Sequence, residues 1–306
     1  MRGLRIVILA ALALALCGRA SAAAPRSWAA PQIGVVVGHG LLAKSVADFR
    51  PQEPLTGSAL AAALQALWTE QHLAPPQLDP SAEPQPADPS TDPPPAPEPA
   101  RAPPAFLRSL AANSAPVTMR QLQIDLVAYL GLDDAAQAVR GTLVKAGLQP
   151  PAGVGSEVVT RLLELRFNHP AGQDDLELLP TQPATRAEAA YSLARMLRLD
   201  EGGVDWVRRL ALSFTLPELT PWQQRVLARA VHFVGYPYVW GGTSEYREAP
   251  FGRVAPGGFD CSGFVWPCTS WSAIRPGPPS PACCVDGRPS RCRARFRAPS
   301  AWRPTS

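Results

Sequence analysis

A short pattern that begins with Pro-x-Thr occurs three times in this chain of 306 residues. The copies start at Pro54, Pro116 and Pro183, and apolar residues follow each threonine mainly at offsets of 4, 8, 11 and 12. That spacing places the side chains on one face of an α-helix. The residues at these offsets are Leu60, Leu64, Leu67 and Trp68 in the first copy, Leu122, Leu126, Tyr129 and Leu130 in the second, and Ala189, Leu193, Met196 and Leu197 in the third.

The threonine of each copy has a clear role at the start of its helix. Its hydroxyl can accept a hydrogen bond from the amide three residues later, and Gln121 and Glu188 stand where a capping box places Gln or Glu. The first copy has Ala59 there and lacks that half of the cap. A further helical segment is predicted over 158–167. Since three short helices cannot each bury an apolar face alone, we expect the copies to pack together.

The third copy reads Thr185-Arg186-Ala187-Glu188, which resembles the Thr-Arg-Ala-Glu signature of S-layer homology (SLH) repeats. Those repeats are all-helical, come in threes and hold bacterial proteins to cell-wall polymers. The resemblance implies that the repeats bind a cell-wall polymer, with Arg186 as the best-matched contact. The other copies depart from the signature, reading Thr-Gly-Ser-Ala from 56 and Thr-Met-Arg-Gln from 118. Plain capped core helices explain the apolar offsets equally well.

The N-terminal residues 1–24 have the pattern of a secretory signal peptide. Arg2 and Arg5 precede an apolar run over 6–16, and small residues follow at Ala20-Ser21-Ala22. The run is shorter than the roughly 20 residues that span a bilayer. We therefore expect a secreted, cell-wall-associated protein with no integral membrane segment after signal removal; the alternative is a buried N-terminal helix.

A proline-rich segment over 74–104 separates the first repeat (30–73) from the second and third (105–212). Proline occupies 13 of the 30 positions in 75–104. Such a segment is expected to be a disordered or extended polyproline spacer, because it cannot form a hydrogen-bonded ladder. It could equally be a long loop within one domain, since loop closure becomes only slowly more costly with length.

From Thr220 the pattern changes, and a separate domain is predicted over 218–266. Thr220, Pro221 and Gln223 form a strong helix start, and Gly235 is the expected stop. A short strand over 236–240 should follow, confined to a sheet edge by Pro237. The apolar face of this helix is predicted to comprise Trp222, Val226, Leu227, Ala230 and Val231.

Cys261 is the strongest candidate for chemistry in the chain. The apolar run after it can open a helix, and a helix N-terminus is one of the settings that stabilise a thiolate. Gly257 and Gly258 let the backbone bend tightly into that helix. The bland alternative is a structural, buried cysteine in an aromatic turn.

The motif Pro-Tyr-Val-Trp-Gly-Gly (237–242), followed by Phe-Asp-Cys-Ser-Gly-Phe-Val (259–265), resembles the nucleophile segment of NlpC-type cell-wall peptidases. These hydrolases are papain-like α+β cysteine peptidases that cut stem peptides of peptidoglycan, typically after γ-D-glutamate. The resemblance implies Cys261 as the nucleophile. It implies that Tyr238, Asp260 and Ser262 line the subsite for the free amino end of the stem peptide. No cofactor or metal is implied.

The rest of the chain departs from that family. A papain-like site needs a histidine base further along the chain, but none of the four histidines follows Cys261. His232 is predicted to be a partly exposed helix residue rather than a substitute base. Residues 267–306 contain eight prolines, seven Arg and four cysteines without an alternating apolar run. We interpret them as a disordered, frameshifted tail that truncates the peptidase domain.

Charge excludes one partner class. The tail carries seven Arg and one acid, a net +6, so the remaining residues carry 4 − 6 = −2 of the overall +4. No nucleic-acid partner is expected, because the basic balance belongs to the tail. The sequence thus predicts a mainly α chain of three SLH-like repeats followed by an incomplete α+β domain. The favoured function is an exported peptidoglycan endopeptidase, inactive as written; the alternative is a non-catalytic protein that binds a cell-wall polymer.

Overall fold

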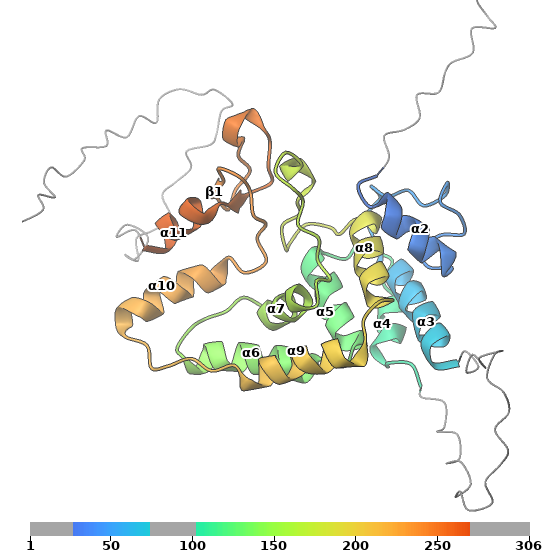
Figure 1. Cartoon of the computed structure of the whole chain (residues 1–306), viewed down its shortest axis with the longest axis horizontal. Helices are drawn as coiled ribbons and strands as arrows, with labels where there is room; N and C mark the ends of the chain where they lie inside the picture. Colours follow the sequence, from blue (N-terminus) through green and yellow to red (C-terminus); the bar gives the residue numbers. More distant parts are fainter. Residues whose placement is uncertain (1–26, 74–101, 270–306) are drawn as a thin grey trace, which may run out of the picture.

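The computed structural model describes residues 27–73 and 102–269, which form a mainly helical molecule (Figure 1). The predicted signal peptide, residues 74–101 of the proline-rich segment and residues 270–306 of the tail lie outside the described residues. The elements are α2 (Ala30–Gly38), α3 (Gly57–Leu73), α4 (Phe106–Ala111), α5 (Met119–Tyr129), α6 (Asp133–Lys145), α7 (Val154–Leu162), the 3₁₀ helix η1 (Asp174–Leu176), α8 (Arg186–Met196), α9 (Glu201–Ser213), α10 (Pro221–His232), β1 (Thr243–Ser244), the 3₁₀ helix η2 (Pro250–Gly252), β2 (Gly258–Phe259) and α11 (Cys261–Thr269).

The three predicted threonine caps are present at α3, α5 and α8. In each case the hydroxyl oxygen of Thr56, Thr118 or Thr185 accepts a hydrogen bond of 3.2 Å from the amide three residues later. The reciprocal half of the capping box is not seen. The side chain of Gln121 instead donates to Asp125, and that of Glu188 lies against His169.

The apolar offsets mark the buried faces of these helices, as predicted. Leu60, Leu64, Leu126, Ala189 and Leu193 are fully buried. The last offset falls at the edge of the core in the second and third copies, where Leu130 and Leu197 are partly buried against it. One continuous core therefore joins all three copies.

A closed ring of backbone hydrogen bonds joins the three Pro-x-Thr segments. The amide of Leu55 donates to the carbonyl of Ala184 (2.8 Å), that of Ala184 to Val117 (2.9 Å), and that of Val117 to Leu55 (2.9 Å). The helix that precedes each threonine packs in the same cyclic order. Helix α2, before Thr56, packs on α8; α4, before Thr118, packs on α3; and α7, before Thr185, packs on α5. The first copy therefore belongs to the same packed body as the second and third.

Two predicted elements have different bounds in the structure. The helix expected over 158–167 is α7, which begins four residues earlier and ends at Leu162; Glu164 just beyond it has a positive φ of 56° that a helix cannot accommodate. The strand expected over 236–240 is reduced to one bridge, between Tyr238 and Phe259. Pro237 contributes no amide to a ladder. The sheet found in the described part of the chain is instead β1 paired antiparallel with β2.

Within residues 27–73 and 102–269, the helices are all too short or too polar to cross a bilayer.

Candidate active site

Cys261 is the first residue of α11, where the sequence predicts it, and its side chain is exposed. The alternative of a buried structural cysteine is therefore wrong. Asp260 precedes it and caps the helix: its Oδ1 accepts from the Gly263 amide at 2.6 Å and from the Ser262 hydroxyl at 2.8 Å. These two donors hold the pKa of the Asp260 carboxyl below its usual value. A charged carboxylate thus stands beside the thiol at neutral pH.

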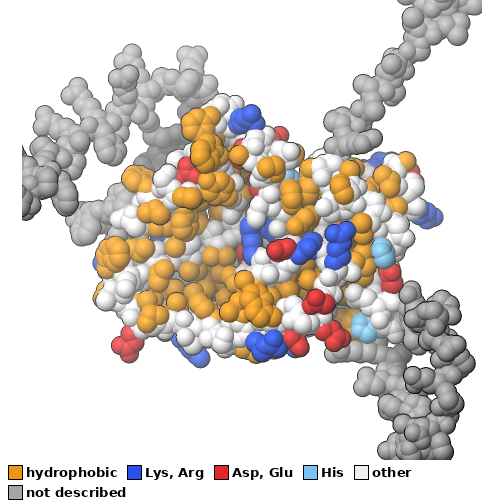
Figure 2. Space-filling view, viewed as in Figure 1, with side chains coloured by type: hydrophobic (Ala, Val, Ile, Leu, Met, Phe, Trp, Pro, Cys, Tyr) orange, Lys and Arg blue, Asp and Glu red, His pale blue; other side chains and the backbone are white. Residues whose placement is uncertain are grey.

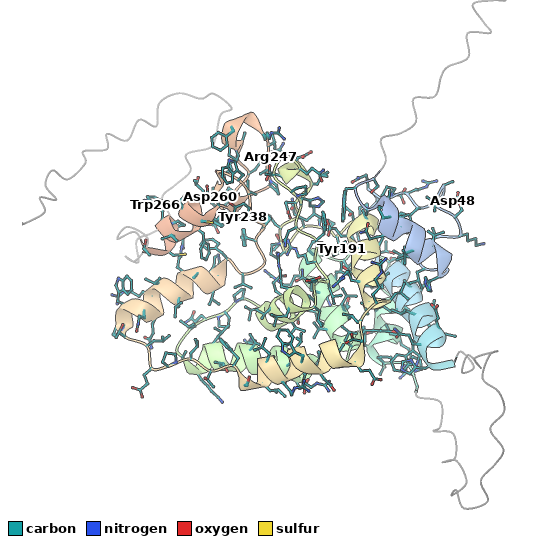
Figure 3. All side chains as sticks on the ribbon, viewed as in Figure 1. Asp48, Tyr191, Tyr238, Arg247, Asp260 and Trp266 are labelled. Atoms are coloured by element: carbon teal, nitrogen blue, oxygen red, sulfur yellow. The ribbon has the colours of Figure 1, made fainter. Side chains whose placement is uncertain are left out.

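The Tyr238 side chain meets Cys261 from the segment before β1. Its pKa is raised, first by desolvation of the hydroxyl and then by the charge of Cys261 and a hydrogen bond to it. Figure 3 shows Tyr238 and Asp260 close together, beside the start of α11. The structure therefore brings together the four residues predicted for the site: Tyr238, Asp260, Cys261 and Ser262.

A pocket of about 280 Å³ lies beside the thiol. It is walled chiefly by aromatic rings, and Asp260 and Cys261 supply its polar edge. Phe233 and Phe259 are buried in the small cluster behind it, with Phe264 partly buried against them. The lining includes Phe233, Tyr236, Tyr238, Phe259, Cys261 and Phe264. Such a surface can receive an extended ligand with apolar character next to an exposed thiol.

Two glycines allow the backbone to close around the thiol. Gly258 has a positive φ of 155°, which supports the predicted bend into α11. A Cβ on Gly263 would lie 2.0 Å from the carbonyl oxygen of Gly242, so only glycine lets α11 approach that loop. The Asp260 amide donates to the same Gly242 carbonyl at 2.9 Å. The first turn of α11 is thereby fixed against β1.

Helix α10 begins as predicted, but its apolar face differs from the prediction. The Thr220 hydroxyl and the Gln223 side chain form a complete capping box. None of the α10 residues is fully buried, and Trp222 is 51% exposed. Leu227 and Val231 pack on the helical core while Val226 and Ala230 pack on the small aromatic cluster. Helix α10 therefore divides its apolar side chains between two hydrophobic clusters, and they are only partly buried in each.

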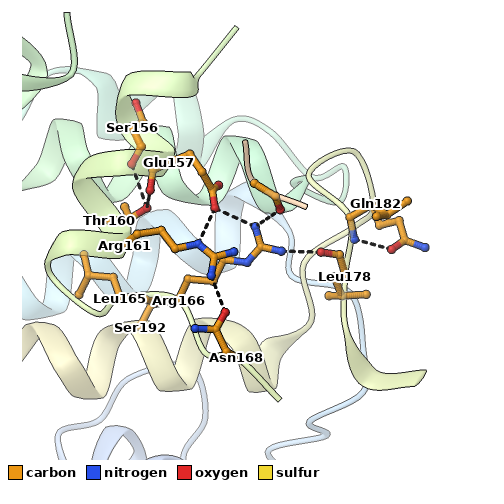
Figure 4. A network of polar contacts seen from close by, with 12 residues as sticks. Ser156, Glu157, Thr160, Arg161, Leu165, Arg166, Asn168, Leu178, Gln182 and Ser192 are labelled. Carbon is orange, nitrogen blue, oxygen red and sulfur yellow. Dashed lines mark hydrogen bonds and ion pairs between the residues drawn. The ribbon is translucent and has the colours of Figure 1, made fainter. Parts of the chain in front are cut away.

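Arg166 attaches the segment over 235–269, here called the Cys261 segment, to the helical body formed by α2 to α9 (Figure 4). Its buried guanidinium donates to Glu157 Oε1 (3.0 Å), to the Leu178 carbonyl (2.6 Å) and to the Gly235 carbonyl (2.8 Å). Gly235 stands three residues before Tyr238. Sequence reasoning missed this residue, because no local pattern distinguishes a buried arginine from a surface one.

No histidine in the described part of the chain forms a hydrogen bond with Cys261. His232 ends α10 with its side chain 55% exposed, and its Nε2 lies 3.6 Å from Glu245 Oε2. This confirms the predicted exposure of His232. The described residues contain no His, Cys, Asp and Glu grouping suited to a metal ion.

Helix α11 crosses residue 266, the predicted end of the domain. Helix α11 continues to Thr269, and both Pro267 and Cys268 are buried. Pro267 lies inside this helix, past its first turn, and cannot donate a helical amide hydrogen bond there. Burial raises the pKa of the Cys268 thiol.

Arg186 lies in the helical body, as the first residue of α8. Its guanidinium donates to the carbonyls of Phe49 (2.7 Å) and Leu42 (2.6 Å) and stacks over the Phe49 ring. These contacts hold the loop between α2 and α3 against α8. They give the side chain a structural task in addition to any role at the surface.

The chain matches no protein-family model, no curated protein and no solved structure.

Proposed function

We propose that the chain is an exported peptidoglycan protein of the NlpC type, in which Cys261 stands at the position of a peptidase nucleophile. The observation that carries this proposal is the exposed thiol at the first position of α11, which shares a pocket with Tyr238 and is adjacent to a capping carboxylate. The SLH-like repeats would tether it to the cell wall. A papain-like fold for residues 218–266 belongs to the same proposal.

The Asp260 carboxylate supports a peptide substrate with a free amino end. Its pKa is lowered, so it is negatively charged at neutral pH and attracts a protonated amine. Tyr238 and Ser262 flank it with hydroxyl groups. The apolar pocket beside Cys261 would take the side chains of a short stem peptide.

Hydrolysis would require the thiolate to attack the peptide carbonyl carbon, with cleavage of the C–N bond to give a thioester that water then hydrolyses. The departing amine needs a proton, and water needs a base; both are supplied by histidine in papain-like sites. Among the described residues, no histidine forms a hydrogen bond with Cys261, and His232 lies against Glu245 instead. We therefore propose that this chain of 306 residues binds stem peptides without cleaving them.

The test is incubation of the purified chain with a γ-D-glutamyl stem peptide, followed by mass spectrometry. No cleavage is expected above that of the Cys261→Ala variant. Cleavage that this variant abolishes would overturn the proposed inactivity, while retaining the family assignment.

The nucleophile can be tested separately by alkylation with iodoacetamide, mapped by peptide mass spectrometry. Cys261 should react rapidly and Cys268 slowly, because only the former is exposed. Equal alkylation rates for the two thiols would contradict the exposure of Cys261 in solution.

The second candidate is a non-catalytic protein that binds a cell-wall polymer through the repeats. It is favoured by the single body that the three copies form around the ring of hydrogen bonds. Co-sedimentation with cell-wall sacculi tests it, comparing Arg186→Ala with the exposed control Arg209→Ala. Since Arg186 holds the α2–α3 loop, thermal melting must accompany the assay. Loss of sedimentation with an unchanged melting temperature would support polymer contact by this side chain.

A further inference from the structure

A second pocket of about 280 Å³ lies between the helical body and the Cys261 segment. It is formed where the loop around η1 meets the loop around η2, which lie side by side in Figure 1. The helical body contributes Asp174, and the other loop contributes Trp240, Phe251 and Arg253. None of these residues belongs to the site around the thiol.

Two aromatic side chains line this pocket and face solvent. Trp240 is 60% exposed and Phe251 is 80% exposed, and exposed apolar side chains are visible over this part of the surface in Figure 2. Phe251 has a positive φ of 51°, a conformation that costs a non-glycine residue on the order of 1 kcal/mol. Its ring is held against Gly241, where a Cβ would lie only 2.4 Å from the ring. The backbone thus carries strain at a position that presents a ring to solvent.

The polar edge of the pocket contains one cation and one carboxylate. Arg253 Nη1 donates to the Gly172 carbonyl at 2.9 Å, which ties the two loops together. Asp174 is 7% exposed, and its Oδ2 accepts from the Gly172 amide at 3.1 Å. Both side chains are therefore held in place before any ligand arrives.

The pocket continues the surface that begins at Cys261. Tyr238 lines the pocket beside the thiol and Trp240 lines the second, while Val239 between them is fully buried. Trp240 follows Tyr238 by two residues and lies in a turn that the Gly242 amide closes by donating to the Val239 carbonyl at 2.9 Å. One short segment of the chain therefore contributes an aromatic side chain to each pocket.

We propose that this second pocket binds a sugar ring of the peptidoglycan glycan while the attached stem peptide lies at Cys261. Aromatic faces suit the C–H faces of a pyranose, and a fixed cation and carboxylate suit its hydroxyl and acetamido groups. The volume is at the small end for ligand pockets, so it fits one ring rather than a chain. The identity of the sugar rests on the proposed function, whereas the pocket rests on its own geometry.

Calorimetric titration of the full chain tests the proposal with two probes. One is the disaccharide N-acetylglucosaminyl-N-acetylmuramic acid, and the other is a sugar-free stem tripeptide. Phe251→Asn removes the ring while placing a residue that tolerates positive φ, so it should retain or raise the melting temperature. It should weaken disaccharide binding at least tenfold and change tripeptide binding by less than twofold.

Trp240→Ala should have the same effect on the disaccharide, and Trp206→Ala, which removes a 52% exposed tryptophan from α9, should have none. Disaccharide affinity that is unchanged in Phe251→Asn, or no binding to the native chain at millimolar concentration, would overturn the proposal. Disaccharide binding without tripeptide binding would support the sugar pocket while refuting the proposed site at Cys261.

Discussion

Asp125 on α5 is a buried carboxylate that should make the stability of the chain depend on pH. It is 5% exposed; its Oδ1 accepts from Gln121 Nε2 at 2.8 Å, and its Oδ2 has no hydrogen-bond partner. Burial raises its pKa from 3.8 to about 6, although the Gln121 bond lowers it. The charged form is therefore disfavoured in the folded state.

The size of the effect follows from the shift. About two pKa units at about 1.4 kcal/mol each set an upper limit near 3 kcal/mol, and residual solvent screening reduces this to about 1–2 kcal/mol. The folded pKa lies above the unfolded one, so the folded state binds the proton more tightly. The contribution of this group to stability is therefore full below about pH 4 and lost as pH rises through 6.

Urea denaturation of native chain and Asp125→Asn between pH 4 and 7.5 measures this effect. The quantity compared is the unfolding free energy of the variant minus that of the native chain. This difference should be about 1–2 kcal/mol greater at pH 7.5 than at pH 4, because the amide cannot ionise. Asp205→Asn is the matched control, since Asp205 is exposed on α9. A native-to-variant difference that stays constant across this range would refute the assignment of the effect to Asp125.

Two further pairs of substitutions test the packing. Gly155→Ala in α7 would place a Cβ 1.9 Å from the Ala136 carbonyl oxygen and should cost about 2–3 kcal/mol of stability. Its control, Gly141→Ala in α6, meets nothing within 4 Å and should stabilise the chain by about 0.5–1 kcal/mol. Chemical denaturation compares the two variants, and equal effects would contradict the α6–α7 contact. Arg166→Leu leaves the buried Glu157 carboxylate without its buried partner and should cost about 3 kcal/mol of stability. Arg161→Leu removes a side chain that is 28% exposed and should cost about 1 kcal/mol. A larger loss for Arg161→Leu in thermal melting would contradict this ranking.

The local features of the helices could be predicted from the sequence because they depend on residues a few positions apart. A threonine hydroxyl reaches an amide three residues later, so the caps at Thr56, Thr118 and Thr185 are local. Apolar offsets are local too. The capping role expected of Gln121 failed because a side chain one turn away, Asp125, offers a competing acceptor.

Features that depend on distant segments could not be predicted. The Leu55–Ala184 hydrogen bond joins residues 129 positions apart, and nothing in either segment specifies its partner. The same holds for the site. The order of residues around Cys261 predicted its position on the helix, but not that the loop of Asp174 would meet Trp240 and Phe251.

The closed ring of Leu55, Val117 and Ala184 makes the order of the copies along the chain irrelevant to how they are held. Each segment donates to one neighbour and accepts from the other, so the ring has neither a first nor a last member. A single peptide-bond cut between residues 73 and 102 would remove none of these bonds or the helix contacts around them. The first copy should then stay attached to the rest after such a cut, and the body could be expressed as a circular permutant that begins at the second copy.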